Sequence, residues 1–400
     1  SPINKLRSEG DWGEQSKTLS SQFLSKQPEY FIKKQLKYTY QDYENELAEI
    51  NSYTNPVIKK KMLLSFADKC DSASVHMKAA ALPRQQTKVL IPIPELGNNE
   101  VYAPDYRDGE KVCLVRYPHG GIFEMPELRV TNKTPAARKA KRTMGTALDA
   151  IGINSKVAQQ LSGADFDGDT VIVIPTNSRV RIKTAPMLEQ LKGFEPKIAY
   201  PYHDGMKVLK KGKATQQAMG TVSNLITDMT LKGASPDEIA RAVKHSMVVI
   251  DAAKHKLDYQ QSYKDNGIAE LKKKYQTHYS EDDGKMHQGA STLISKRNKK
   301  VKVPATQGSG RIDPDTGRVI YKQSGKMRYS KKEGKMVPVY KEVPLLSTYD
   351  DLHRLSSGSP AEEAYADYGN KLKALANTAR KEYLRTPLLK KNPSASKTYA

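Results

Sequence analysis

Three aspartates at alternate positions, Asp165, Asp167 and Asp169, are the feature that most constrains this chain. Carboxylates this close repel one another strongly unless a cation holds them together. Gly168 precedes the last aspartate and allows a tight loop, in which alternate side chains can point to one side. Hard oxygen ligands at this density suit Mg²⁺, with Mn²⁺ as a substitute, above all where nucleotide phosphates complete the coordination shell. We therefore expect these three aspartates to form a metal site.

Two other interpretations of the acidic loop fit less well. An EF-hand also spaces acids by two residues, but it needs glycine at its sixth position and glutamate at its twelfth. Counted from Asp165, the glycine is fourth and the twelfth residue is Thr176. A solvated acidic turn is the other alternative. The apolar run Val171–Ile174 argues against it, because it follows the loop directly and places the aspartates at the edge of a core.

The charge of the chain indicates a polyanionic partner. The sequence has 66 Lys and Arg against 44 Asp and Glu, a formal net charge of +22, and nucleic acid is the commonest partner of so basic a protein. Two cysteines are too few for a disulfide framework and fit a reducing compartment. No apolar run is long enough to predict a membrane span, and no signal-peptide pattern is present. We expect a cytoplasmic protein, in the bacterial host if a phage encodes it, with no membrane partner.

The local patterns divide the chain into five segments. Residues 1–84 are polar with apolar residues at helical spacing, and residues 85–180 contain short β-rich runs between prolines and glycines. Such strands with irregular connections favour a compact barrel. Residues 181–280 are mostly helical in pattern, 281–345 are a basic loop or hairpin segment, and 346–400 are a helical C-terminal segment. No internal repeat is evident.

Several helix boundaries can be predicted more closely. Ser235 and Pro236 have the residue types of an N-cap and a first helical position. A second helix is expected over 268–275 and a third over 361–384. The basic segment 135–148 fits either a short helix or a loop.

The acidic loop resembles the metal-binding loop of the two-barrel RNA polymerases. This family includes the β′ subunits of cellular enzymes and the single-chain RNA-silencing and phage-type polymerases, and the pattern is closest to the single-chain enzymes. Residues 114–121, Leu-Val-Arg-Tyr-Pro-His-Gly-Gly, resemble the family's Arg-x-Pro segment. Residues 244–254 are similar to a segment of the silencing-type enzymes that starts with His-Ser and has an Asp followed three residues later by a Lys. The three blocks stand in the family's order, and the resemblance covers about residues 85–260.

The resemblance implies an α+β fold, with a double-psi β-barrel that carries the acidic loop between helical N- and C-terminal regions. It implies that Asp165, Asp167 and Asp169 hold the catalytic Mg²⁺ and that Arg116 lies beside the incoming nucleotide. It also implies that Lys254 lies near nucleic acid or the site. The implied activity is that of an RNA polymerase, a nucleotidyltransferase. It joins nucleoside triphosphates into RNA on a DNA or RNA template.

The basic run over 296–302 suggests a second nucleic-acid contact. We interpret it as an arm that follows phosphates and is disordered when unbound, with a solvated loop as the alternative. The candidate contacts in this run are Lys296, Arg297, Lys299 and Lys300. Further along, three tyrosines interleaved with cations either stack on bases or pack in a small hairpin. They are Tyr321, Tyr329 and Tyr340, beside Lys322, Arg328 and Lys331.

The chain departs from the family in one main respect. The polymerases use a second barrel whose lysines bind the triphosphate, and residues 1–84 show no strand set for it. Because the sequence starts at Ser1 without methionine, we expect a piece of a longer polypeptide, with the second barrel before it or in another subunit. Three functions stay open: an RNA polymerase subunit or fragment from a phage or mobile element, a catalytically incomplete nucleic-acid-binding scaffold derived from the same barrel, or a Mg²⁺-dependent nuclease.

Overall fold

The chain forms two compact units, each assembled from separate stretches of sequence. The first comprises residues 1–32, 79–295 and 357–362, and the second comprises residues 33–78, 296–356 and 363–400. The fold is mixed α+β. The computed structural model describes residues 19–77, 86–117, 119–145, 147–161, 163–177, 180–280, 283–303, 310–321, 325–331 and 333–388.

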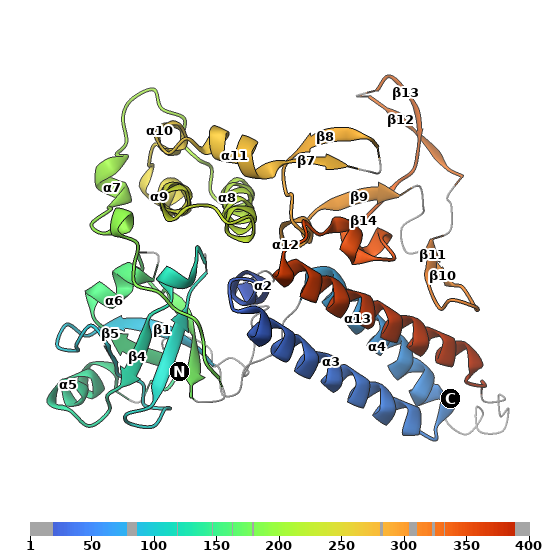
Figure 1. The fold of residues 1–400 in the computed structure, drawn as a ribbon, viewed down its shortest axis with the longest axis horizontal. Helices are drawn as coiled ribbons and strands as arrows, with labels where there is room; N and C mark the ends of the chain where they lie inside the picture. The colour runs from blue at the N-terminus through green and yellow to red at the C-terminus, as the bar shows by residue number, and fades with distance from the viewer. Residues whose placement is uncertain are drawn as a thin grey trace, which may run out of the picture. The chain divides into compact units, whose positions relative to one another are not determined.

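A six-stranded sheet in the first unit is nearly closed into a barrel (Figure 1). Its strand order is β2-β4-β3-β6-β1-β5. An isolated bridge joins the two ends of this order, because the N–H groups of Tyr102 and Gly152 each donate to the carbonyl of the other. The expected compact barrel is therefore present. Its strands are β1 (Gln86–Pro92), β2 (Glu100–Val101), β3 (Lys111–Val115), β4 (Glu127–Val130), β5 (Ala150–Ile153) and β6 (Thr170–Thr176).

Each ladder of the barrel joins one of its first three strands to one of its last three. β1 pairs parallel with β5 and antiparallel with β6. In the same way, β4 pairs parallel with β2 and antiparallel with β3. The antiparallel ladder between β3 and β6 completes the set. Exchanging the first three strands for the last three leaves this list unchanged, so the pairing pattern has an internal two-fold symmetry.

Alternation along the strands gives the barrel an apolar inside and an apolar outer patch. In β1, Leu90 belongs to the inner core, whereas Val89 packs outside the barrel in a cluster with Ala137. Ala137 lies on helix α5 (Pro135–Met144), which is N-capped by Thr134. Within the basic segment 135–148, residues 135–144 thus form a short helix.

The first unit also contains a helical layer built around α8 and α9, which pack against each other (Figure 1). Helix α9 starts at the predicted place. The Ser235 hydroxyl accepts from the Glu238 N–H, and the Glu238 carboxylate accepts from the Ser235 N–H, a capping box with Pro236 in the first turn. The helices of this unit are α2 (Leu19–Leu24), η1 (Ile122–Glu124), α5, α6 (Ser155–Gln160), η2 (Glu189–Leu191), α7 (Pro196–Ala199), α8 (Lys213–Leu231), α9 (Pro236–His255), α10 (Tyr259–Asp265), α11 (Ile268–Gln276) and α12 (Leu293–Lys296).

Long helices and two-stranded sheets make up the second unit (Figure 1). The helices share a buried core that includes Phe66, Tyr365 and Leu372. The Arg380 guanidinium, itself buried, forms an ion pair of 2.7 Å with Asp71. The helices are α3 (Glu29–Ser52), α4 (Pro56–His76), η3 (Leu345–Thr348), η4 (Leu352–Leu355) and α13 (Pro360–Arg385). The strand pairs are β9 (Lys300–Val303) with β14 (Lys341–Pro344), β10 (Gly310–Ile312) with β11 (Val319–Tyr321), and β12 (Met327–Ser330) with β13 (Lys335–Pro338). In the first unit, β7 (Thr277–Ser280) pairs with β8 (Lys285–Gln288).

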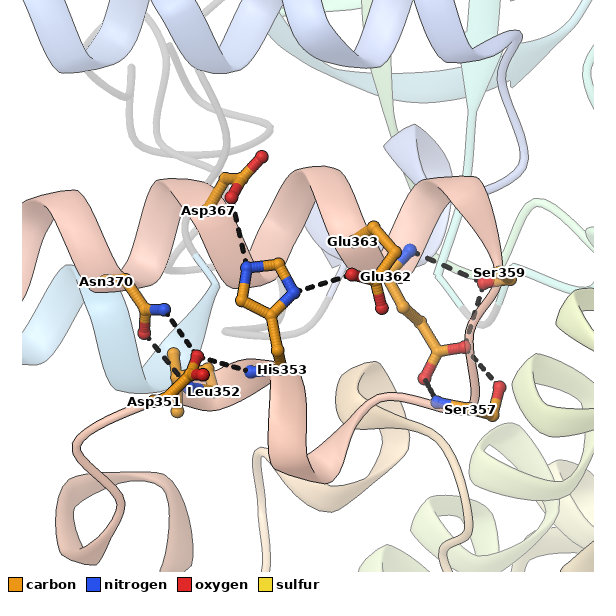
Figure 2. Close-up of polar contacts among 9 residues, drawn as sticks. All are labelled: Asp351, Leu352, His353, Ser357, Ser359, Glu362, Glu363, Asp367 and Asn370. Carbon is orange, nitrogen blue, oxygen red and sulfur yellow. Dashed lines mark hydrogen bonds and ion pairs between the residues drawn. The ribbon is translucent and has the colours of Figure 1, made fainter.

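Two acidic side chains of the first unit are fully buried and hydrogen-bonded. Asp228 accepts from the Gln276 amide, the Thr292 hydroxyl and the backbone N–H groups of Ser291 and Thr292. Glu362 accepts from backbone N–H groups and from serine hydroxyls, and Figure 2 shows its contacts with Ser357 and Ser359. All these donors are neutral, so the two acids act as fixed hydrogen-bond acceptors within the fold.

A histidine is held between two acids in the second unit (Figure 2). His353 Nδ1 lies 2.5 Å from Glu363 Oε2, and its Nε2 lies 3.0 Å from Asp367 Oδ1. Burial alone lowers the pKa of His353, but the hydrogen bonds to these carboxylates outweigh burial and raise it above its ordinary value. These contacts join η4 to α13.

Among the described residues, every helix is too short or too polar to cross a membrane.

Candidate metal centre and substrate pocket

The acidic loop connects helix α6 to strand β6 of the barrel. Its end is fixed by a hydrogen bond of 2.9 Å from the Leu90 N–H to the Asp169 carbonyl. Three described residues of the loop have positive φ, Gly163 at 69°, Phe166 at 60° and Gly168 at 110°. Glycine adopts such a conformation without steric cost, as the sequence led us to expect. Phe166 packs against the inner core of the barrel, which leaves the aspartates to face outward.

The loop brings its three aspartates together. One carboxylate oxygen from each of Asp165, Asp167 and Asp169 lies within 4.8 Å of the others. Neighbouring ligands of an octahedral Mg²⁺ lie about 3 Å apart and opposite ones about 4 Å apart, so small side-chain rotations would bring these oxygens to one ion. Three hard anionic donors at this separation fit a divalent cation.

Arg116 forms an ion pair with Asp169. Arg116 directly follows β3 and Asp169 directly precedes β6, and the antiparallel ladder between these strands brings the two residues side by side. The other oxygen of Asp169 accepts a hydrogen bond of 2.9 Å from the Asp165 N–H. The side chains of Arg116 and Asp169 are only 12% and 11% exposed. Asp169 is therefore the most firmly held of the three acids.

Lys254 of helix α9 faces the other two aspartates. Its Nζ forms an ion pair with Asp167 and lies 3.6 Å from Asp165 Oδ2. The hydrogen bond from Lys254 is the main cause that lowers the pKa of Asp167, and the same bond raises the pKa of Lys254. Ion pairs thus link the acidic loop to helix α9, and Lys254 lies beside Asp165 and Asp167.

A pocket of about 520 Å³ opens beside the aspartates. This volume lies within the range of about 300–1,000 Å³ of small-molecule sites. Asp251, one helical turn before Lys254 on α9, lines the pocket, and burial raises its pKa. The wall opposite the loop comes from the segment around η2 and α7. The lining residues that carry polar or aromatic groups are Arg116, Ser155, Gln159, Asp165, Phe166, Asp167, Asp169, Phe194, Glu195, Lys197 and Asp251.

The remaining predicted contacts belong to the second unit. Lys299 and Lys300 are exposed, and Lys300 begins strand β9. Lys296 ends helix α12 and donates to the Leu355 carbonyl. Arg297 is buried, with only 2% of its surface exposed. The expectation of a disordered arm is wrong for these residues, because the run enters a helix end and a strand, and Arg297 offers no accessible surface to phosphates in this conformation. Lys322 lies outside the described residues.

The two histidines near the predicted motifs are packed residues. His119 and His245 are buried, and burial is the main cause that lowers the pKa of each, in the case of His245 to about 4. The Ser262 hydroxyl lies 3.0 Å from His245 Nδ1. Neither histidine lines the pocket at the aspartates.

Sequence reasoning missed the far wall of the pocket. Phe194 and Lys197 line it but belong to no motif, and neither does Gln159, which lines the pocket from α6. A lone glutamine on a short helix and a lone lysine near a proline are common on any surface, so no local signal distinguishes them. Their role follows only from the packing of α6 and α7 around the loop.

Comparisons with known proteins are sparse. No family model matches the sequence, and no curated protein does. Among solved structures, the chain is similar to the RNA dependent RNA polymerase QDE-1 from Thielavia terrestris, at 13% sequence identity and a TM-score of 0.35. The similarity covers 55% of this chain and 27% of that chain, so it spans about a quarter of the polymerase's length. At that TM-score the similarity establishes no family.

Proposed function

We propose that this chain carries the metal-binding half of an RNA polymerase active site and transfers nucleotides from nucleoside triphosphates to an RNA 3′ end. The observation that carries the proposal is the arrangement of Asp165, Asp167 and Asp169. Their oxygens lie within 4.8 Å of one another at the mouth of a pocket large enough for a nucleotide. A strongly basic chain would then meet a nucleic-acid template and its product.

The barrel supports this proposal through its pairing pattern. A double-psi barrel has six strands related by a two-fold axis, which agrees with the symmetry of the ladders here. We interpret the first unit as such a barrel, with the acidic loop before its last strand. The resemblance of residues 165–169 to the polymerase metal loop is consistent with this placement.

Each side chain of the site has a proposed task. Asp165, Asp167 and Asp169 would hold Mg²⁺, with Mn²⁺ as a substitute. When bound, the ions activate the attacking hydroxyl and neutralise charge on the leaving pyrophosphate. Arg116 and Lys254 form ion pairs with the aspartates, and we propose that both contact phosphate or ribose oxygens of a bound nucleotide.

The lysines of a second barrel have no counterpart among the described residues. Every described sheet other than the barrel has two strands. We propose that a second barrel, in another domain or subunit, supplies the groups that face Asp167 across the substrate.

Two other functions compete with this one. A binding scaffold has no need of three clustered acids, and their mutual repulsion disfavours keeping them without a cation. A Mg²⁺-dependent nuclease would use the same metal ligands. It should degrade RNA or DNA in the absence of nucleoside triphosphates, whereas a polymerase should not.

Incorporation of labelled ribonucleotides is the decisive measurement. The chain, with any second-barrel partner added, is incubated with Mg²⁺ and nucleoside triphosphates on DNA and RNA templates. We expect incorporation that Asp167→Ala lowers about 100- to 1,000-fold, the loss typical when one group that stabilises charge in the transition state is removed.

The matched control is Asp204→Ala, which removes an exposed acid of the first unit outside the pocket. It should leave incorporation unchanged. Equal activity of wild type and Asp167→Ala would rule out the site. Nuclease products without nucleoside triphosphates would favour the nuclease instead.

A further inference from the structure

The hairpins β7–β8 and β12–β13 repeat one eight-residue pattern, Tyr-Ser-x-x-acid-Gly-Lys-Met. It begins at Tyr279 in the first unit and at Tyr329 in the second. In both hairpins the tyrosine is paired with the methionine and the serine with the lysine. The glycine N–H donates to the serine carbonyl in each, at 2.9 Å and 2.8 Å. The expectation of no internal repeat is therefore wrong at this local scale, and the strand register makes the repeat evident.

Both hairpins expose the paired tyrosine and methionine. Tyr279 and Met286 are 62% and 63% exposed, and Tyr329 and Met336 are 63% and 53% exposed. Met327 lies on the same face of β12 as Tyr329, because side chains two apart on a strand point to one side, and it is also exposed. Large apolar side chains grouped on a surface indicate a binding site more often than isolated ones do.

The two hairpins differ in charge. Between the paired strands, the first reads Glu-Asp-Asp at 281–283 and the second reads Lys-Lys-Glu at 331–333. The described cations of the second hairpin are Lys326, Arg328, Lys331 and Lys335, of which Arg328 and Lys335 alternate with Tyr329 and Met336 along the strands; Glu333 is the described acid, 3.8 Å from Lys335. The exposed tyrosine and methionine therefore lie beside an acidic turn in the first hairpin and beside a basic turn in the second.

We propose that the outer face of β12–β13, formed by Met327, Tyr329 and Met336, stacks against an unpaired base of a single-stranded nucleic acid. Every base has a π face, so an exposed tyrosine binds single strands with little sequence preference. Lys331 in the turn, with Arg328 and Lys335 from the other face of the narrow hairpin, contacts the flanking phosphates. A paired base is already stacked within its duplex, so the platform selects single strands. The acidic turn of β7–β8 excludes that hairpin from the same role.

This inference deepens the proposed function by naming a contact for template or product, yet it is tested without catalysis. Fluorescence anisotropy follows the binding of labelled oligouridine to the chain in EDTA, with no nucleoside triphosphates present. We expect Tyr329→Ala to weaken binding about 5- to 100-fold, while Tyr329→Phe retains binding because it keeps the aromatic ring. Binding to duplex RNA should be insensitive to either change.

Tyr279→Ala is the matched control, because it removes the equivalent side chain from the hairpin of opposite charge. It should leave the affinity unchanged. Replacing Lys331 and Arg328 by alanine should reduce the slope of log affinity against log salt by about 0.7 for each phosphate that the variant no longer neutralises. Tyr329→Ala should leave that slope intact.

Three outcomes would overturn the proposal. Tyr329→Ala could bind like the wild type, or Tyr279→Ala could weaken binding equally, which would show a general loss. Sedimentation could show that the wild type self-associates through this face and that Tyr329→Ala abolishes the association, which would assign the face to a second copy. Because Tyr329 is exposed on a two-stranded hairpin, unfolding of the variant is not expected, and thermal melting checks this. Failure of Asp167→Ala to change incorporation would leave these binding results standing, so the two proposals fail separately.

Discussion

The acids of the barrel loop and the buried acids of the helical layer are held in opposite ways. Asp228 accepts hydrogen bonds from amide, hydroxyl and backbone donors that cannot leave without unfolding their segment. Asp167 and Asp169 instead meet Lys254 and Arg116, two side-chain cations beside an open pocket. Both arrangements keep a carboxylate from being an isolated charge, which would be costly. Only the second can be exchanged for a ligand, and this distinguishes a site from a structural contact.

The largest stability effect should come from the buried class. Asp228→Ala removes the acceptor for the side chains of Gln276 and Thr292 and for two backbone N–H groups while all of them stay buried. We expect a loss of about 2–4 kcal/mol in the free energy of unfolding, measured by urea denaturation. Asp228→Asn should cost less, since it keeps one acceptor oxygen. A loss below about 1 kcal/mol for alanine would show that the contrast with the loop is wrong.

Mg²⁺ should stabilise the fold through the acids of the loop and not through the buried acids. A cation that binds only the folded chain stabilises it by about 2.7 kcal/mol at a hundred times its dissociation constant. The melting temperature of the wild type should therefore rise with Mg²⁺ concentration, and that of Asp169→Asn should rise much less. Asp228→Asn serves as the control and should respond as the wild type does. A wild-type melting temperature that is insensitive to Mg²⁺ and Mn²⁺ would remove the metal site.

Without metal, the loop acids should contribute little to stability. Asp167→Asn replaces a half-exposed carboxylate that is both attracted by Lys254 and repelled by its neighbours. We expect the free energy of unfolding in EDTA to change by no more than about 0.5 kcal/mol, as followed by circular dichroism during denaturation. A large loss would show that the loop acids are structural, like Asp228.

The smallest effect on stability should come from Glu363 and Asp367, the two acids that are hydrogen-bonded to the titratable side chain of His353. The raised pKa of His353 means that its stabilising contribution is fully present below the ordinary value of about 6.5 and is lost as pH rises through the raised pKa. His353→Gln should therefore flatten the decline of stability over the pH range from the ordinary value of about 6.5 upward through the raised pKa. Urea midpoints of both proteins across this range give the comparison. Parallel profiles would contradict the role of Glu363 and Asp367.

The sequence predicted local features well and assembly poorly. The start of α9 at Ser235, the tight turn at Gly168 and the grouping of the three aspartates all depend on neighbours within a few residues. Arg297 shows the limit, because a run of cations predicts exposure unless distant segments bury it. The pocket wall at Lys197 was equally invisible, since it arises from packing between segments far apart in sequence. Lys254 was found only through the resemblance, and its interaction with the loop depends on how α9 packs.

The crossed pairing of the barrel has a consequence for its synthesis. No ladder joins two of the first three strands, so β1, β2 and β3 have no partners until β4 and then β5 and β6 have emerged from the ribosome. Such long-range pairing is slow, because loop closure must come before any contact can stabilise the sheet. Arg116 and Asp169 meet only across the last of these ladders, between β3 and β6. The nascent chain therefore cannot set Arg116 against Asp169 before the last strand of the barrel has been translated, so the acidic loop gains this counter-charge only when the barrel closes.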